Sequence, residues 1–65
     1  APPAGLEPRE ARVYEALPLS GVATPAALAR VAGLSEPDVR VALGYLELAG
    51  QVVPARHGWR RAAAG

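Results

Sequence analysis

The chain has 65 residues and a formal net charge of +1, with seven Arg, six acidic residues and no Lys or Cys. A chain of this length makes one small domain, and without Cys it has neither disulfides nor a Cys-based metal site. The nearly balanced charge excludes a strong overall attraction to nucleic acid, and no apolar run approaches the roughly 20 residues that span a membrane.

The chain opens with APPAGLEP, a stretch rich in Pro, Ala and Gly that is typical of a linker. We therefore expect residues 1–6 to be a linker from a larger, cytoplasmic protein, with the folded domain over residues 7–61. The last residues, AAAG, have no pattern that would hold them in a fold. Residues 62–65 are accordingly predicted to be a disordered tail.

A first helix is predicted from about Glu7, because Pro8 suits the first helical turn. Val13, Tyr14 and Leu17 share one face of that helix, and this face is expected to pack on the core. A proline ends the helix. The LSGVA stretch that follows is too short to stand alone and predicts a strand that pairs with another one.

Two more helices are predicted from the residues at their ends. The second begins after Thr24, a suitable N-cap, with Pro25 at its first position, and it ends at Gly33. The third begins after the N-cap Ser35 and ends at Gly50. Only a short glycine-containing turn separates the two helices, which is typical of a helix-turn-helix.

The stretches QVVP and WRR then read as two strands, joined by a turn that contains Gly58. The order helix, short strand, helix, turn, helix and hairpin predicts a mainly α fold, a three-helix winged helix-turn-helix with a small β-hairpin wing. Ala29 is small where the two motif helices must approach closely, and Tyr14 and Trp59 are expected in the core. The shared core of the motif is predicted to contain Leu28, Ala32, Leu34, Val39, Ala42, Leu43 and Leu46.

The residues from Val13 to Arg61 resemble the C-terminal winged-helix domain of the bacterial DNA-processing protein DprA, also called Smf. The motifs that carry the resemblance are LARVAGLSEPDV, LELAGQV and a Gly-aromatic-Arg-Arg ending of the wing. The resemblance implies a parent protein in natural transformation and recombination. In that family a separate Rossmann-like domain binds single-stranded DNA and the recombinase RecA, so this domain would be an accessory one.

Nothing in the sequence predicts catalysis, a cofactor or a metal site. The hydroxyl side chains other than Tyr are Ser20, Thr24 and Ser35, and two of these are expected helix caps. Nucleophilic catalysis needs a nucleophile, a base and an orienting group in contact. The lone His57 lacks an evident carboxylate partner, and a single His makes a poor metal site. We therefore expect a protein that is not an enzyme.

A basic cluster in the wing, Arg56, His57, Arg60 and Arg61, is the best candidate for DNA binding. Arg can lie along a phosphate backbone or enter a minor groove, so the predicted binding is weak and independent of base sequence. Replacement of any of these Arg residues by Ala should reduce the salt dependence of binding. The alternative is a solvated hairpin whose charges prevent pairing with other chains.

The third helix lacks the side chains that read base edges. It adds a single candidate for DNA contact, Arg40, and otherwise presents apolar groups away from the core. Val41, Tyr45 and Leu48 form one stripe with Gly44 beside it, which predicts a protein-interaction surface. Within this stripe we expect Leu48 to pack internally under the first helix, and Val41 and Tyr45 to make external contacts.

Three functions follow from these observations. The first is an accessory domain of a DprA-like protein, which binds DNA through its wing or protein through its third helix, the partner being the rest of its own chain or a recombination protein such as RecA. The second is the DNA-binding domain of a transcriptional regulator, and the third is a winged helix that binds only protein. In each case the isolated domain is expected to be a monomer.

Overall fold

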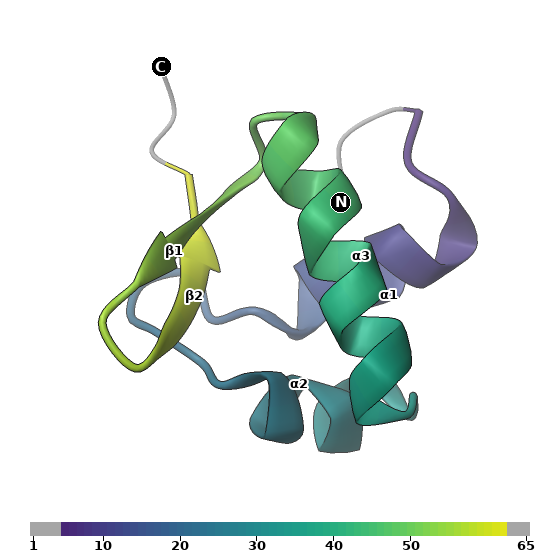
Figure 1. Cartoon of the computed structure of the whole chain (residues 1–65), viewed down its shortest axis with the longest axis horizontal. Helices are drawn as coiled ribbons and strands as arrows, with labels where there is room; N and C mark the ends of the chain where they lie inside the picture. Colours follow the sequence, from purple (N-terminus) through teal and green to yellow (C-terminus); the bar gives the residue numbers. More distant parts are fainter. Residues whose placement is uncertain (1–4, 63–65) are drawn as a thin grey trace.

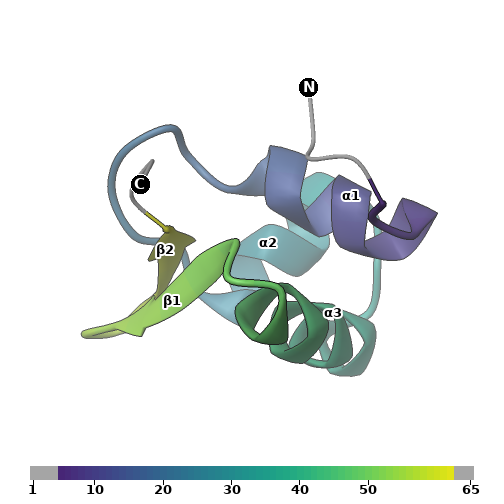
Figure 2. The same ribbon diagram turned by 90° about the horizontal axis from the view of Figure 1, so that it is seen from above.

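The computed structural model describes residues 5–62 and contains three helices followed by a two-stranded hairpin. The elements are α1 (Pro8–Ala16), α2 (Pro25–Ala32), α3 (Glu36–Leu48), β1 (Val52–Ala55) and β2 (Gly58–Arg61). Figure 1 and Figure 2 show the three helices packed together and the hairpin extending from one side of them. This architecture is the predicted three-helix winged helix.

The helix starts lie where the capping residues predict them. The Thr24 hydroxyl accepts a hydrogen bond from the Ala27 amide at 3.1 Å, and the Ser35 hydroxyl accepts one from the Asp38 amide at 3.2 Å. Each such cap stabilises a helix by about 1 kcal/mol. Each of the three helices also has a Pro in its first two positions, where the missing amide proton costs no hydrogen bond.

The turn of the helix-turn-helix depends on Gly33, which has a φ of 72° and a ψ of 35°. This left-handed conformation is open to Gly at little cost and ends α2 sharply. The carbonyl of Ala32 in the last turn also accepts a 2.6 Å hydrogen bond from the Arg12 guanidinium of α1. A cation at the carboxyl end of α2 complements the helix dipole, so Arg12 fastens α1 to the turn.

The core lies between the three helices and the hairpin, and it contains the predicted side chains. Val39, Leu43 and Leu46 of α3 are completely buried, and they face α1 and α2. Trp59 packs against this core but stays partly exposed, so the expected burial of its ring is met only in part. The buried core residues are Val13, Leu17, Leu28, Ala32, Val39, Ala42, Leu43, Leu46 and Val52, and Tyr14, Ala29 and Leu34 pack against the core.

The hairpin is antiparallel, with Val52 opposite Arg61 and Ala55 opposite Gly58. The strand predicted in LSGVA is reduced to one bridge, in which Ala23 exchanges two 2.9 Å backbone hydrogen bonds with Trp59. This single bridge attaches the hairpin to the segment between α1 and α2.

The structure also bears on the ends of the domain. Leu6, predicted to belong to the linker, packs against the core, and the Ala62 amide donates a 2.9 Å hydrogen bond to the Gln51 carbonyl. Both residues therefore contact the domain predicted over residues 7–61. Residues 1–4 of the predicted linker and residues 63–65 of the predicted tail lie outside the described residues.

Candidate functional site

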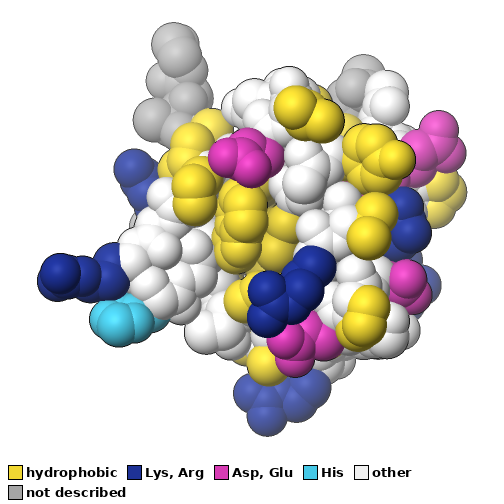
Figure 3. Space-filling view, viewed as in Figure 1, with side chains coloured by type: hydrophobic (Ala, Val, Ile, Leu, Met, Phe, Trp, Pro, Cys, Tyr) yellow, Lys and Arg dark blue, Asp and Glu magenta, His cyan; other side chains and the backbone are white. Residues whose placement is uncertain are grey.

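Arg56 and His57 lie at the tip of the hairpin. These two residues form the turn between β1 and β2, and both are exposed. His57 has a φ of 68°, a left-handed conformation that His adopts more readily than most residues other than Gly. Figure 3 shows basic side chains and the histidine projecting from the molecule at this hairpin end.

Close packing at Gly58 holds the hairpin on the rest of the fold. A Cβ atom at this position would overlap the carbonyl group of Ala23 and press on the Val22 side chain. The glycine therefore allows the backbone of β2 to approach Ala23 closely enough for the bridge to form. This backbone contact between β2 and Ala23 therefore helps to fix the position of the wing relative to the helices.

The alternation of β2 separates its two Arg side chains. Trp59 and Arg61 share the face toward the core, whereas Arg60 is on the opposite face and exposed. The Arg61 guanidinium donates a 3.0 Å hydrogen bond to the Tyr14 carbonyl and lies 4.4 Å from the centre of the Tyr14 ring. Arg61 thus joins the wing to α1, and the structure does not bring it together with the other predicted DNA-binding residues of the wing.

Charge is distributed unevenly along the chain. Residues 50–65 contain three Arg and no acidic residue, whereas residues 1–49 contain four Arg and six acidic residues. The small net charge is therefore the sum of a positive C-terminal segment that contains the hairpin and a negative segment that contains the helices. We name the exposed set Arg56, His57 and Arg60 the wing cluster. It can donate hydrogen bonds to phosphate oxygens without a competing carboxylate in its own segment.

Arg40, the DNA-contact candidate on α3, has a different environment. Its guanidinium makes a 2.8 Å ion pair with Glu36 one turn earlier, and the side chains of Arg40 and Glu36 are 63% and 44% exposed. It lies on α3 and not on the hairpin, so it does not belong to the wing cluster. An exposed pair of this kind contributes little to stability and leaves the Arg free to change partners.

The outward face of α3 carries the predicted apolar stripe. Val41 is 47% exposed, Tyr45 58% and Leu48 87%, and they border a shallow hollow together with Gly44 and Arg40. The expectation that Leu48 packs under the first helix is wrong. Leu48 lies two residues after the buried Leu46, and two residues correspond to about 200° around a helix, so it points away from the core. We name Val41, Gly44, Tyr45 and Leu48 the α3 stripe.

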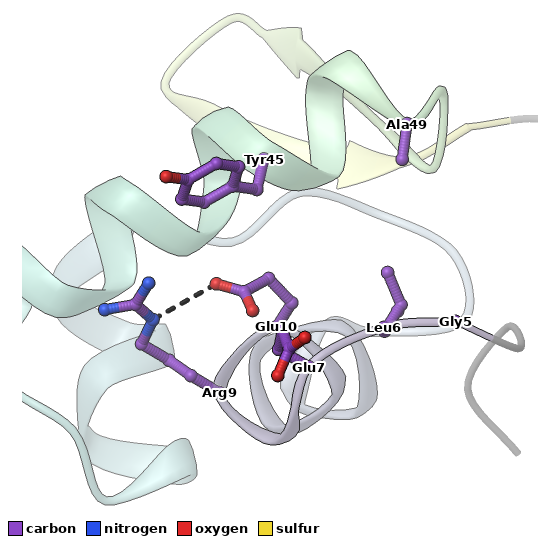
Figure 4. Close-up of a pocket in the computed structure, with 7 residues that line it drawn as sticks. All are labelled: Gly5, Leu6, Glu7, Arg9, Glu10, Tyr45 and Ala49. Carbon is purple, nitrogen blue, oxygen red and sulfur yellow. Dashed lines mark hydrogen bonds and ion pairs between the residues drawn. The ribbon is translucent and has the colours of Figure 1, made fainter.

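A second hollow, between the start of α1 and the end of α3, contains a buried carboxylate. Figure 4 shows Tyr45 of α3 and Ala49, which follows α3, on one side of it, and Leu6, Arg9 and Glu10 on the other. The Glu10 side chain is buried, and it accepts a 3.1 Å hydrogen bond from Arg9. Glu10 lies three residues before Val13 and seven before Leu17, so helical spacing places it on the core-facing side of α1. Its burial is missing from the sequence-based predictions because a charged side chain is not an expected core residue.

The arrangement offers no assembled catalytic group within residues 5–62. Two of the hydroxyl side chains, Thr24 and Ser35, cap helices, and His57 lies alone at the hairpin end. In the same part of the chain no three His, Cys, Asp or Glu side chains come together as a metal site. Over these described residues, no helix combines the length and the apolarity that a membrane span requires.

Comparison with known families identifies a winged-helix family. The family model for the DprA winged helix domain matches residues 1–56. The match includes α1, the complete helix-turn-helix, β1 and the first residue of the turn, and it ends before β2. Neither the curated proteins nor the solved structures that were searched gave a match.

Proposed function

The chain belongs to the DprA winged helix domain family, and from this premise we propose that it contacts the nucleic-acid backbone through its wing. In this role it is an accessory, non-catalytic domain of a DNA-processing protein in natural transformation and recombination. A cytoplasmic location and assistance to a recombinase such as RecA are parts of the same proposal, since both follow from the role of the family.

The observation that carries this proposal is the wing cluster. Arg56, His57 and Arg60 are exposed at one end of the molecule, in a segment without acidic residues. Phosphate contacts need accessible cations and little shape complementarity, and the end of a projecting hairpin meets both conditions. With so few contacts, we expect a dissociation constant on the order of 10⁻⁴ M at physiological salt.

The same geometry favours binding that ignores base sequence. A helix that reads the major groove offers Arg, Lys, Asn or Gln to base edges, but the outward face of α3 offers Val41, Tyr45 and Leu48. Arg40 is the one basic side chain beside them on this helix, and it is paired with Glu36. The alternative role, DNA recognition by a transcriptional regulator, would require this helix to select bases and is therefore less favoured.

The test is to titrate the chain against a random duplex and a random single strand at low salt. In the variant Arg56→Ala/Arg60→Ala we expect at least tenfold weaker binding to the preferred strand form, because two of the cations that face phosphate are removed. The matched control is Arg30→Ala, which removes an exposed Arg from α2 rather than from the wing. An equal weakening in the wing variant and the control would contradict a role for the wing.

A second candidate function is protein contact through the α3 stripe. Its support is the exposure of three large apolar side chains in a row on one helix, with Leu48 at 87%. Exposed apolar patches of this kind are typical of interaction surfaces. The two functions are compatible, because the wing cluster and the α3 stripe occupy different elements.

A further inference from the structure

We propose that the α3 stripe binds the same stripe of a second copy of this chain, with the two α3 helices antiparallel. This rests on the protein-contact role proposed above for α3, and it names the partner. Three features of α3 carry it: the spacing of the apolar residues, the open space at Gly44 and the placement of two opposite charges.

The spacing is that of a helix-pairing seam. Val41, Gly44 and Leu48 are separated by three and then four residues, which is the repeat that brings side chains of two paired helices together. They lie on the face opposite the buried Leu43 and Leu46, so the seam points directly away from the domain. Nothing in residues 5–62 covers it, since Val41 and Leu48 remain 47% and 87% exposed.

Gly44 leaves room for a side chain from outside. No atom lies within 4 Å of the place where its Cβ would stand, and the hollow around it has a volume of about 300 Å³. In an antiparallel pair centred between positions 44 and 45, the partner's Tyr45 fills this hollow. The same register packs Val41 against the partner's Leu48, so each apolar group of the stripe gains an apolar neighbour.

The charges select a second copy in the antiparallel orientation. Arg40 and Glu47 are seven residues apart and lie on the same flank of the stripe. In an antiparallel pair like flanks meet, so Arg40 lies on the side of the partner's Glu47. In this register the two positions are offset by two residues, about 3 Å along the helix axis, which the long side chains of Arg and Glu can span. A parallel pair would set this flank against Tyr45 and make no ion pair. The exposed Arg40 can leave or share its present partner Glu36 at little cost.

The contact is small. Two stripes on 13-residue helices bury less than the roughly 1,200 Å² of a stable interface, so the dimer must be weak. We expect a dissociation constant on the order of 10⁻⁴ M, at which the chain is a monomer when dilute and a dimer when concentrated. The expectation of a monomer, stated from the sequence, then holds only for dilute solution.

The test is sedimentation equilibrium of the 65-residue chain from micromolar to millimolar concentration. The native chain is expected to dimerise, and the single variants Arg40→Glu and Glu47→Arg to dimerise at least tenfold more weakly, because like charges then meet. An equimolar mixture of these two variants should regain the association, since each chain offers two charges opposite to those of the other. The matched control Arg30→Glu makes the same charge change on α2 and should associate like the native chain.

Three results would overturn the antiparallel pair: a native chain that stays monomeric at every concentration, single variants that associate like the native chain, or a mixture that associates no better than its components. Failure here is separable from failure of the wider protein-contact role. In that role, labelled chain added to the remainder of a DprA-like protein would bind through Tyr45 whether or not the chain dimerises. Loss of that binding in Tyr45→Ala, without any dimer, would leave the protein-contact role standing and remove the second copy as the partner.

Discussion

The hairpin end and the outward face of α3 are both exposed, but their chemistry is opposite. The hairpin end presents Arg56, His57 and Arg60, whereas α3 presents Val41, Tyr45 and Leu48. In sequence-reading helix-turn-helix proteins the second helix of the motif carries the base contacts. Here α3 occupies the position of a recognition helix in the fold, but it lacks the polar side chains with which such a helix reads bases. The fold therefore fixes where a surface lies, and the side chains on that surface decide what it binds.

The largest expected effect separates the inner face of α3 from its outer face. Leu43→Ala should lower the free energy of unfolding by roughly 2–5 kcal/mol, because Leu43 is completely buried and its truncation leaves a cavity. Leu48→Ala removes the same atoms from a residue that is 87% exposed, and it should change stability by less than about 0.5 kcal/mol. Urea unfolding followed by circular dichroism measures both. Similar destabilisation in the two variants would mean that the stripe is covered in solution.

The next effect concerns the attachment of the wing. Gly58→Ala should destabilise the domain by roughly 1–3 kcal/mol, because the added Cβ overlaps the Ala23 carbonyl and the bridge to Trp59 must open. Hydrogen exchange of the Ala23 and Trp59 amides should become faster than that of the amides in α3. An unchanged exchange rate at these two amides would show that the bridge does not hold the hairpin.

A smaller effect is expected to distinguish the two adjacent Arg residues of β2, one of which supports stability and the other DNA binding. Arg61→Ala should cost roughly 1–2 kcal/mol of stability, since it removes a hydrogen bond to Tyr14 and the stacking on its ring. Arg60→Ala should leave stability within about 0.5 kcal/mol and weaken DNA binding instead. Thermal unfolding and a DNA titration of the same two variants test this division. Native stability together with a loss of DNA affinity in Arg61→Ala would contradict these separate roles of Arg60 and Arg61.

The smallest effect acts in opposite directions on stability and on association. Gly44→Ala should stabilise the domain by about 0.5–1 kcal/mol, because Gly is a poor helix former and no atom within 4 Å opposes the new Cβ. The same methyl group occupies the hollow expected to receive the partner's Tyr45, so dimerisation should weaken. Chemical unfolding and sedimentation of one sample measure both quantities. A variant that gains stability and associates as well as the native chain would show that Gly44 is not at a contact.

The sequence predicts the fold well because its local rules agree with one another. Thr24 and Ser35 cap the helices predicted to follow them, and Gly33 adopts the left-handed conformation that a helix end requires. These predictions depend on neighbouring residues only. The wing is predicted from a longer stretch of sequence, namely a turn between two short β-like stretches. The observed hairpin, with Ala55 opposite Gly58, confirms that prediction.

Side-chain roles that depend on contacts between distant residues are less accessible from the sequence. Arg60 and Arg61 are adjacent and chemically identical, and only the contact of Arg61 with Tyr14, 47 positions earlier, distinguishes them. The internal position expected for Leu48 is wrong, although the prediction of Leu46 in the core is confirmed. Two residues correspond to about 200° around a helix, so the two predictions are incompatible, and the structure shows Leu48 turned toward solvent.

The central claim is that the wing contacts DNA and α3 does not. The salt dependence of DNA binding tests this claim most directly. The slope of the logarithm of the binding constant against the logarithm of the salt concentration counts phosphate contacts. We expect Arg56→Ala/Arg60→Ala to flatten this slope by about two units relative to the native chain. The matched double variant Tyr45→Ala/Leu48→Ala should leave both slope and affinity unchanged. A flattened slope in the α3 variant, with a native slope in the wing variant, would show that α3 faces the DNA.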